Sequence, residues 1–485
     1  MINWITSRIR GEKKKERVKI EVEELKKALI EDPKFRDEIL RELEYRTGRR
    51  DLLKAGVLGL LGLAVGGAAG AGGAAVGNET VIETISDYTG VKIPKPCTCI
   101  VAQDGTGDYD VLPNEDASEV IQEAIDYAYK KGGGKVKIRE GAYQISRTLY
   151  LKNGVSVVGE GACYNLWSEK CRGTILMKED NSGAVIQDGE FLQRVELEKI
   201  GIVSKKGTAI LLNNKYYLHV IIRDCEIYSM NGIHADELER SFELLIFNNR
   251  LTSRGGNIGI YLGPKNSDNM ICNNIIRGYE IGILLDGSSC TVINNHIYKH
   301  PTPSIRYGIR VNRGGCIILS NYIEGKPSIA GIEIKSSREI ISNNVIWVKR
   351  GADCIILDRN TSGWLSHITI TNNIMSGEDE KNYALNAIKL GNNVTNLWEV
   401  NIKDNIAFAC QNFKQTENSG TAIIKAGQSS VVVNHNLIHK PSKVLVTPTD
   451  NIGSVWVTNV TASQFTINCS VTPNKDVQIN WYAKV

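Results

Sequence analysis

A short motif recurs through the second half of this 485-residue chain and limits what the chain can fold into. It reads apolar, any residue, Asn, any residue, apolar, and it returns every 21 to 32 residues. Its shared asparagines are Asn249, Asn274, Asn295, Asn321, Asn344, Asn373, Asn405 and Asn436. A second motif, a small residue followed by Ile, any residue and an apolar residue, follows in most repeats, as in Gly282 to Leu285. Two short strands in each repeat predict the coils of a solenoid.

The repeat also predicts which kind of solenoid this is. Helix signals are nearly absent between the strands, which excludes leucine-rich and other α/β solenoids, and a propeller blade needs roughly 40 residues. Stacked coils lie about 4.8 Å apart, so an Asn in the wall of each coil can bond the Asn above and below it. We therefore expect a structural asparagine ladder, whose members also adopt the left-handed backbone of a tight corner. Cys290 and Cys316 share one column of adjacent coils and are expected to be stacked apolar residues.

The passage before the repeats predicts a helical plug. Asp116 or Ser118 can cap a helix with one apolar face, and Gly132 to Gly134 ends it. Gly133 to Tyr143 reads Gly-Gly-x-Val-x-Ile-x-x-Gly-x-Tyr, which resembles the first coil of the pectate lyase superfamily. Gln103 to Asp108 is similar to pectinesterases, which share that fold. The resemblance implies an all-β chain, a right-handed parallel β-helix of about ten coils over residues 100–439, closed by an N-terminal helix.

The second motif predicts a polar stripe on one outer face, because its middle residue and the residue two positions after its end point outward. The stripe contains His234, Asp236, Tyr261, Asp286, Arg310, Asn312, Glu333, Lys335 and Asp358. A polysaccharide groove uses carboxylates for acid-base work or Ca²⁺, cations against uronate charge, and tyrosines under sugar rings. Six residues are candidates for catalysis: Asp236, Asp286, Arg310, Glu333, Lys335 and Asp358. Tyr261 and Asn312 are candidate carbohydrate contacts.

Other features argue against turnover. Asp286 and Asp358 lie three coils apart, roughly 14 Å, beyond the about 5–9.5 Å of glycosidase pairs, and Asp236 and Asp286 lie near that limit. The Asp-Asp and Gly-His-Gly signatures of polygalacturonases are absent, and Glu333 replaces Arg in their Arg-x-Lys signature. The lyase arginine signature and the later pectinesterase motifs are also missing. An ionic ladder, with Arg310 beside Glu333, is the alternative, so a polysaccharide lyase or glycoside hydrolase activity stays open.

Composition restricts cofactors and partners. Net charge is +4, with no dense basic stripe after residue 55, so nucleic acid is not an expected partner. The eleven cysteines show no zinc spacing, and Cys163 and Cys171 are either a loop disulfide or two thiols. The segment from Gly377 to Asn382 is either an acidic Ca²⁺ loop or an ordinary solvated loop.

The N-terminal hundred residues predict location. Residues 1–48 form a charged, helical extension, and residues 49–77 begin with Arg49-Arg50-Asp51-Leu52-Leu53-Lys54, which resembles a twin-arginine export signal despite the long leader. The alternatives are a membrane anchor through residues 52–77 or a Gly/Ala linker. Either export or anchoring places the chain from the 78–99 linker onward outside the cytoplasm. Five Asn-x-Ser/Thr sequons there fit a glycoprotein.

Residues 440–485 alternate as four or five strands and form a C-terminal β-cap. They resemble the small terminal β-domains of surface and phage-tail β-helix proteins, which cap, form trimers or recognise receptors. We expect a secreted or cell-surface β-helix that binds, and in one reading cleaves, polysaccharide. The alternative is a non-catalytic structural protein, such as an adhesin or a virus-like spike, that forms a homotrimer.

Overall fold

The computed structural model describes residues 97–163, 172–179, 183–213, 216–236, 241–299, 305–379, 381 and 383–485. The predicted N-terminal extension 1–48 and the export or anchor segment 49–77, with Arg49 and Arg50, lie outside the described residues, as does most of the 78–99 linker. Within the described part, no helix combines the length and the apolar character that a bilayer crossing needs.

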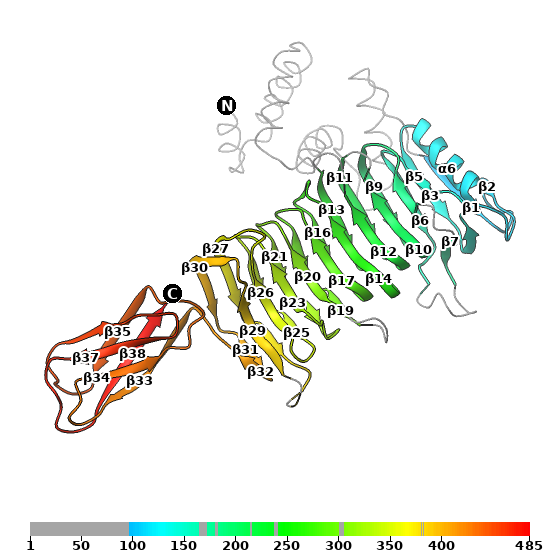
Figure 1. Cartoon of the computed structure of the whole chain (residues 1–485). Coiled ribbons are helices and arrows are strands. Elements are labelled where there is room, and N and C mark those ends of the chain that lie inside the picture. The colour runs from blue at the N-terminus through cyan, green and yellow to red at the C-terminus, as the bar shows by residue number, and fades with distance from the viewer. Residues whose placement is uncertain are drawn as a thin grey trace, which may run out of the picture. The chain divides into compact units, whose positions relative to one another are not determined.

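The described chain begins with a helical plug. Strands β1 (Cys97–Ala102) and β2 (Tyr109–Asp110) precede α6 (Ser118–Lys130), which buries Ile121, Ala124, Ile125 and Ala128 on one face. The Asp116 carboxylate accepts hydrogen bonds from the backbone N–H and the hydroxyl of Ser118. Gly132 to Gly134 ends the helix with positive φ at each glycine. Figure 1 places α6 at the end of the first coils, as the sequence predicted.

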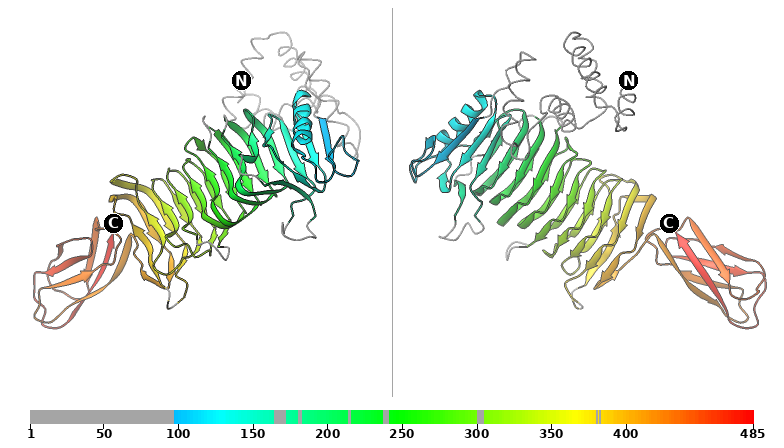
Figure 2. Two further views of the ribbon diagram at one scale, coloured as in Figure 1. Left: turned by 45° about the vertical axis from the view of Figure 1, so that its right-hand side comes forward. Right: turned by 180° about the vertical axis from the view of Figure 1, so that it is seen from behind.

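Three walls of parallel strands follow, stacked coil upon coil (Figures 1 and 2). Wall 1 contains β1, β3 (Gly134–Ile138), β6 (Val155–Gly159), β9 (Leu192–Glu198), β11 (Tyr217–Arg223), β13 (Ser241–Phe247), β16 (Met270–Cys272), β18 (Thr291–Ile293), β21 (Ile317–Leu319), β24 (Ile340–Ser342), β27 (Gly363–Thr371) and β30 (Val394–Lys403), with β15 (Asn266–Ser267) paired to β13. Wall 1 ends in each regular coil just before the asparagine of the first motif.

The asparagine leads into wall 2, and a loop then leads into wall 3. Wall 2 contains β4 (Gly141–Gln144), β7 (Thr174–Lys178), β19 (His296–Tyr298), β22 (Tyr322–Ile323), β25 (Val345–Trp347), β28 (Ile374–Ser376) and β31 (Ile406–Phe408). Wall 3 contains β5 (Leu149–Leu151), β8 (Ala184–Asp188), β20 (Tyr307–Val311), β23 (Ala330–Ile334), β26 (Asp353–Leu357), β29 (Ala384–Leu390) and β32 (Cys410–Asn412). The long strands β10 (Gly201–Leu212), β12 (Glu226–Ala235), β14 (Arg250–Leu262) and β17 (Ile275–Leu285) run through both walls.

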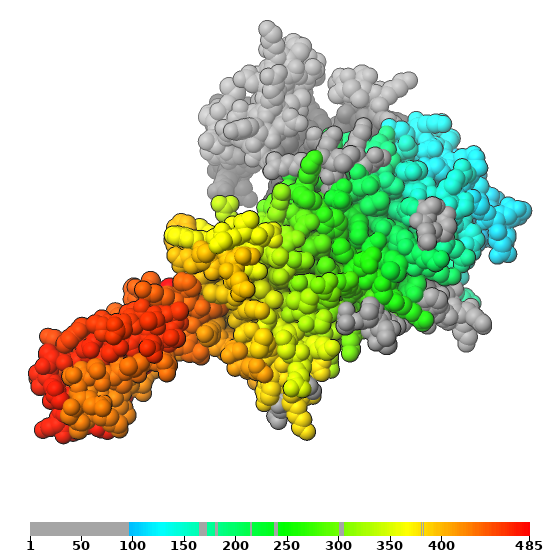
Figure 3. Space-filling model, in the orientation of Figure 1, coloured from blue at the N-terminus to red at the C-terminus, as the bar shows by residue number. Residues whose placement is uncertain are grey.

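These walls form an all-β parallel β-helix of about 10 turns, which confirms the predicted fold class. Its core is built from the inward Ile, Leu and Val of each coil, most of them less than 3% exposed. Cys290 and Cys316 stack within this core at 0% exposure. The space-filling view shows the coils as successive bands packed against one another (Figure 3).

An asparagine ladder joins the coils at the corner between walls 1 and 2. Asn249 Nδ2 donates to Asn274 Oδ1 at 3.0 Å, and the same bond repeats at every step to Asn405. Each amide from Asn249 onward also donates to a backbone carbonyl of the preceding coil. The left-handed backbone belongs to the residue before each ladder asparagine, such as Asn248 and Asn294, with φ of 57° and 56°. Our expectation that the ladder members themselves are left-handed was therefore wrong.

The C-terminal part contains two antiparallel three-stranded sheets. One has the order β33 (Glu417–Ile424), β38 (Val477–Lys484), β35 (Lys443–Pro448), and the other β34 (Ser430–Asn434), β37 (Gln464–Cys469), β36 (Val455–Thr458). Because β33 and β34 pair into these sheets, this part begins near residue 417 and not at the predicted 440. The motif around Asn436 imitates a coil, but Asn436 is outside the ladder and its amide donates to Phe413 O at 3.3 Å.

Candidate functional site

Wall 3 places most of the predicted polar stripe on one outer face. Its register aligns His234, Tyr261, Leu284, Arg310, Glu333, Ile356 and Lys389 in one column across seven consecutive coils. Leu284 and Ile356 interrupt this column, so the polar residues occur in separate groups. Asp236, Asp286, Asn312, Lys335 and Asp358 follow two residues after the column, where each strand has ended.

Asp286 is the centre of one such group. Tyr261 Oη donates to Asp286 Oδ2 at 3.0 Å, and Asn312 Nδ2 donates to Asp286 Oδ1 at 2.5 Å. The three residues come from consecutive coils. Both carboxylate oxygens are therefore already bonded across the coils, which is the arrangement of a structural bridge.

Arg310 and Glu333 form a second group. Arg310 Nε lies 2.5 Å from Glu333 Oε2, although the N–H is not directed at that oxygen, so the contact is ionic. The Arg310 guanidinium also lies 4.9 Å from the ring centre of Tyr307. A third group, missed by the sequence reasoning, pairs Lys389 Nζ with Asp353 Oδ2 at 3.2 Å. These cross-coil pairs correspond to the ionic ladder that was the alternative interpretation of the stripe.

The other predicted acids and Lys335 stay separate. Asp236 is exposed beside Gly263, and Asp358 Oδ1 accepts a long 3.4 Å bond from the backbone of Asn393. Asp236 and Asp286 are separated by two coil steps, and Asp286 and Asp358 by three. Lys335 is half-buried, one coil beyond Asn312. The structure thus brings no two of the three predicted aspartates to adjacent coils.

His234 lies at the edge of the Asp286 group. Its ring meets that of Tyr261 edge to face at 5.6 Å. Burial lowers the pKa of His234 to about 4, so the imidazole is neutral at physiological pH. Its Nε2 is buried and has no hydrogen-bond partner within the described residues. His234 therefore belongs to the wall as a neutral packing residue.

A buried carboxyl group also lies inside the solenoid. Glu339 is fully buried one coil after Cys316, and its carboxylate accepts bonds from the Cys316 backbone at 2.8 Å and from the Ser336 hydroxyl at 2.7 Å. Burial raises the pKa of Glu339 to about 7. This buried acid has no access to a ligand, so we assign it to the wall.

Wall 2 carries a group of aromatic side chains that the sequence reasoning missed. We call His296, Tyr298, Tyr322 and Trp347 the aromatic row. The rings of His296 and Tyr322 stack at 4.9 Å with 13° between their planes, and Trp347 meets Tyr322 edge to face at 5.8 Å. His296 Nε2 lies 2.8 Å from Glu324 Oε1. The sequence does contain a signal, because these residues stand one or three positions after a ladder asparagine.

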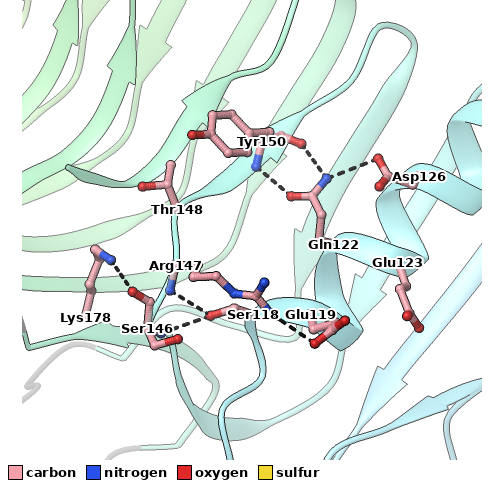
Figure 4. A pocket seen from close by; sticks show the side chains of 10 residues that line it. All are labelled: Ser118, Glu119, Gln122, Glu123, Asp126, Ser146, Arg147, Thr148, Tyr150 and Lys178. Carbon is pink, nitrogen blue, oxygen red and sulfur yellow. Dashed lines mark hydrogen bonds and ion pairs between the residues drawn. The ribbon is translucent and has the colours of Figure 1, made fainter. Parts of the chain in front are cut away.

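Figure 4 shows a pocket of about 560 Å³ between α6 and the first coils. Gln122 on α6 exchanges two hydrogen bonds with the backbone of Tyr150, at 2.8 and 3.1 Å. Arg147 pairs with Glu119 at 3.1 Å, and Lys178 donates to Ser146 O at 2.7 Å. The bonds of Gln122 and Glu119 hold the plug helix against β5 of wall 3 and the turn before it, so the pocket is a structural joint.

The described residues contain no group of three His, Cys, Asp or Glu side chains suited to hold a metal ion. The predicted Ca²⁺ loop includes Glu380 and Asn382, which lie outside the described residues. Cys163 is disulfide-bonded, and its predicted partner Cys171 also lies outside them.

Comparison with known proteins agrees at the level of fold. Residues 170–321 match the family model of the right handed beta helix region, whereas no curated protein matches the chain. Similar solved structures include the A-module of a mannuronan C-5 epimerase from Azotobacter vinelandii, with 18% identity over 64% of this chain and 96% of that one, at a TM-score of 0.47. The Dettilon tailspike protein has 13% identity over 82% of this chain and 96% of its own, at 0.46.

DFA-IIIase from Arthrobacter chlorophenolicus has 12% identity over 62% of this chain and 94% of its own, also at 0.46. Identities and TM-scores this low add nothing about activity. The chain is a right-handed parallel β-helix protein.

Proposed function

We propose that this chain is an extracytoplasmic protein that binds a polysaccharide along the outside of its β-helix and does not cleave it. The observation that carries this proposal is the aromatic row on wall 2. Tyr322 and Trp347 extend the row over neighbouring coils, and Trp347 is 42% exposed. Large flat apolar rings with polar edges suit the C–H faces and hydroxyls of sugars.

The geometry of the row matches a chain-like ligand. Successive coils are about 4.8 Å apart, close to the length of one sugar unit, so a glycan lying along the wall meets a new side chain at each coil. Glu324 lies beside His296 and supplies a hydrogen-bond acceptor for hydroxyls. A repeated shallow contact of this kind favours a polymer over a compact small molecule.

The absence of cleavage in this proposal rests on wall 3. The carboxylates of Asp286, Glu333 and Asp353 are each engaged across the coils. A general acid and base must face the substrate at a suitable separation. No two of the predicted aspartates lie on adjacent coils, so a hydrolase or lyase centre is not part of the proposal.

The extracytoplasmic location draws on two features. Arg49 to Lys54 resembles an export signal, and the disulfide at Cys163 fits an oxidising compartment. Asn360 and Asn459 begin sequons and are exposed, so a glycoprotein is compatible with it. Protease treatment of intact cells tests the location, since a cytoplasmic chain would stay uncut.

A spike or adhesin role remains the second candidate, favoured by the two separate antiparallel sheets after residue 417. Such proteins use a terminal domain for attachment or trimer formation. Light scattering coupled to size-exclusion chromatography measures the oligomeric state. A homotrimer without glycan binding supports this candidate over polysaccharide binding.

Native gels containing alginate, polygalacturonate, xylan or β-glucan, together with a glycan array, test the proposed binding. We expect retardation in at least one polysaccharide. The double substitution Tyr322→Ala and Trp347→Ala should strongly reduce it, since both rings lie on the proposed contact face. Trp456→Ala is the matched control, because this indole is similarly exposed, at 46%, but lies on β36.

The gel results distinguish binding at the aromatic row from binding elsewhere. A retarded wild type and control, with a much less retarded double variant, supports the proposal. Equal retardation of all three places the contact elsewhere and contradicts it, as does a wild type that binds none of these polysaccharides. Release of new double bonds or reducing ends from a bound polysaccharide would contradict the non-catalytic part alone.

A further inference from the structure

Two tryptophans stand exposed on neighbouring strands of wall 1. Trp364 on β27 is 59% exposed and Trp398 on β30 is 54% exposed. In the register of these strands Trp364 pairs with Asn396 and Ser366 pairs with Trp398. The two indoles are therefore diagonal neighbours on the same outer face, one coil apart.

Neither indole contributes to the core. Leu365, Ile368, Val400 and Ile402 fill the interior from these strands and are all less than 8% exposed. An exposed indole presents a large apolar area that water solvates poorly, and two exposed indoles on neighbouring strands of one face mark a contact surface. Packing of the coils does not explain why both positions are tryptophan.

A polar pair lies beside one of the indoles, that of Trp398. The ring of His367 meets Trp398 edge to face at 4.8 Å, and His367 Nε2 lies 2.9 Å from Glu399 Oε2. Both side chains are about half exposed, at 43% and 58%. An imidazole–carboxylate pair offers hydrogen-bond donors and acceptors at the edge of a flat apolar surface.

The turn that presents Trp364 is held in place. Arg359 Nη1 donates to the backbone oxygen of Trp364 at 2.6 Å, and the Asn393 side chain from the next coil donates to Arg359 O at 2.8 Å. A turn fixed by bonds within and between the coils loses little further freedom on binding, which favours affinity.

We propose that Trp364, Trp398, His367 and Glu399 form a second carbohydrate site that takes one pyranose unit of a glycan. The indoles pack against the C–H face of the ring, and the His367–Glu399 pair bonds its hydroxyls. The inference rests on the proposed polysaccharide binding but uses a different wall from the aromatic row. A long glycan that occupies both sites gains affinity because the second contact is intramolecular.

The test compares two double variants with the wild type. One carries Trp364→Ala and Trp398→Ala, the other Tyr322→Ala and Trp347→Ala, and Trp456→Ala is the control. Calorimetry with an oligosaccharide cut from the polysaccharide that retards the protein in gels gives the number of sites. We expect two sites in the wild type and control, and one in each double variant.

The parent polysaccharide tests the linkage of the two sites. Loss of either site should weaken its binding by about 100-fold, whereas the short oligosaccharide binds the remaining site with unchanged affinity. Trp364→Phe with Trp398→Phe should keep two sites at reduced affinity, which separates loss of the ring face from loss of folding. Circular dichroism checks that every variant retains its strands.

The other possible outcomes of the calorimetry each contradict one of the two proposed sites or both. If the Trp364/Trp398 variant keeps two sites, the inference is overturned while the proposed function stands. If only that variant loses sites and the Tyr322/Trp347 variant keeps them, the aromatic row is wrong and the second site is the true one. A wild type that binds none of the probes overturns both. A change in self-association alone, measured by light scattering, identifies a protein contact and also overturns the inference.

Discussion

Arg310 on β20 and Glu333 on β23 form an ion pair across adjacent coils, with 2.5 Å between Nε and Oε2. The Glu333 side chain is only 8% exposed, and the side chain of its partner Arg310 is 26% exposed. A buried charge that loses its partner is costly, whereas an apolar replacement of both partners is often neutral. This relationship decides whether the wall 3 stripe is structural.

Arg310→Met should therefore lower the free energy of unfolding by about 2–4 kcal/mol, because it leaves Glu333 uncompensated. Adding Glu333→Leu should recover most of this loss. Urea denaturation of the wild type, both single variants and the double variant gives the coupling. If Arg310→Met alone removes glycan retardation while stability is unchanged, the stripe is a binding site and not a ladder.

Neighbouring asparagines in one turn should respond very differently to the same substitution. Asn295→Gly removes an amide that joins two coils and should cost about 2–4 kcal/mol, since it leaves buried partners unsatisfied. Asn294→Gly should be nearly neutral, because Asn294 is exposed with φ of 56°, a conformation that glycine adopts freely. Urea denaturation compares the two variants. Equal losses would show that the ladder adds nothing beyond the turn.

His234 should make the protein less stable in acid. The pKa of His234 in the folded state, about 4, lies below the ordinary 6.5. Between these two pH values the imidazole is therefore neutral in the folded state and protonated in the unfolded chain. Stability is then lost as pH falls from 6.5 towards 4, by about 1.4 kcal/mol per unit. The difference between wild type and His234→Gln, measured by urea denaturation across this range, should follow that slope. A flat difference would mean that the imidazole reaches water.

Glu339 should act in the opposite direction. Its folded pKa of about 7 lies above the ordinary 4.5, so the folded state keeps a proton that the unfolded chain releases. Stability therefore falls as pH rises from 4.5 through 7. Burial also raises the pKa of Glu226 to about 7, so only the difference between wild type and Glu339→Gln isolates Glu339. Thermal melts from pH 5 to 8 should show that difference shrinking or reversing, and a pH-independent difference would contradict the prediction.

The fold was predictable because each coil repeats the same chemistry. The asparagine column marks one corner of the regular coils, and the small-Ile motif marks the wall 3 strand in most of them. Their spacing predicted a solenoid, which the resemblance of the opening segment identified as a parallel β-helix. The outward stripe of wall 3 also followed from strand alternation, down to the neighbours Arg310 and Glu333. The sequence alone could not show whether the charged side chains of wall 3 contact a ligand or one another. That depends on how deeply the surrounding loops bury the Glu333 side chain.

Other features of the structure depend on how the strands pair, and the repeat motifs in the sequence do not determine that pairing. Trp398 sits on β30, which extends its wall 1 strand by several residues, and its proximity to Trp364 appears only when the strands are paired. The left-handed turn residue precedes the ladder asparagine, and in Asn-Asn pairs either residue satisfies the sequence rule. Asn436 fits the motif by composition, yet it lies outside the ladder, and the strand just before it, β34, pairs antiparallel with β37.

The ladder also has a consequence for how such a chain is made. Each of its bonds joins residues only 21 to 32 positions apart, and every coil pairs with the coil before it and the coil after it. A coil can therefore settle onto its predecessor as soon as its own residues are available, from the α6 end onward. Adding or removing one whole coil preserves every type of bond between coils. The length of the solenoid can therefore change in evolution by one coil at a time.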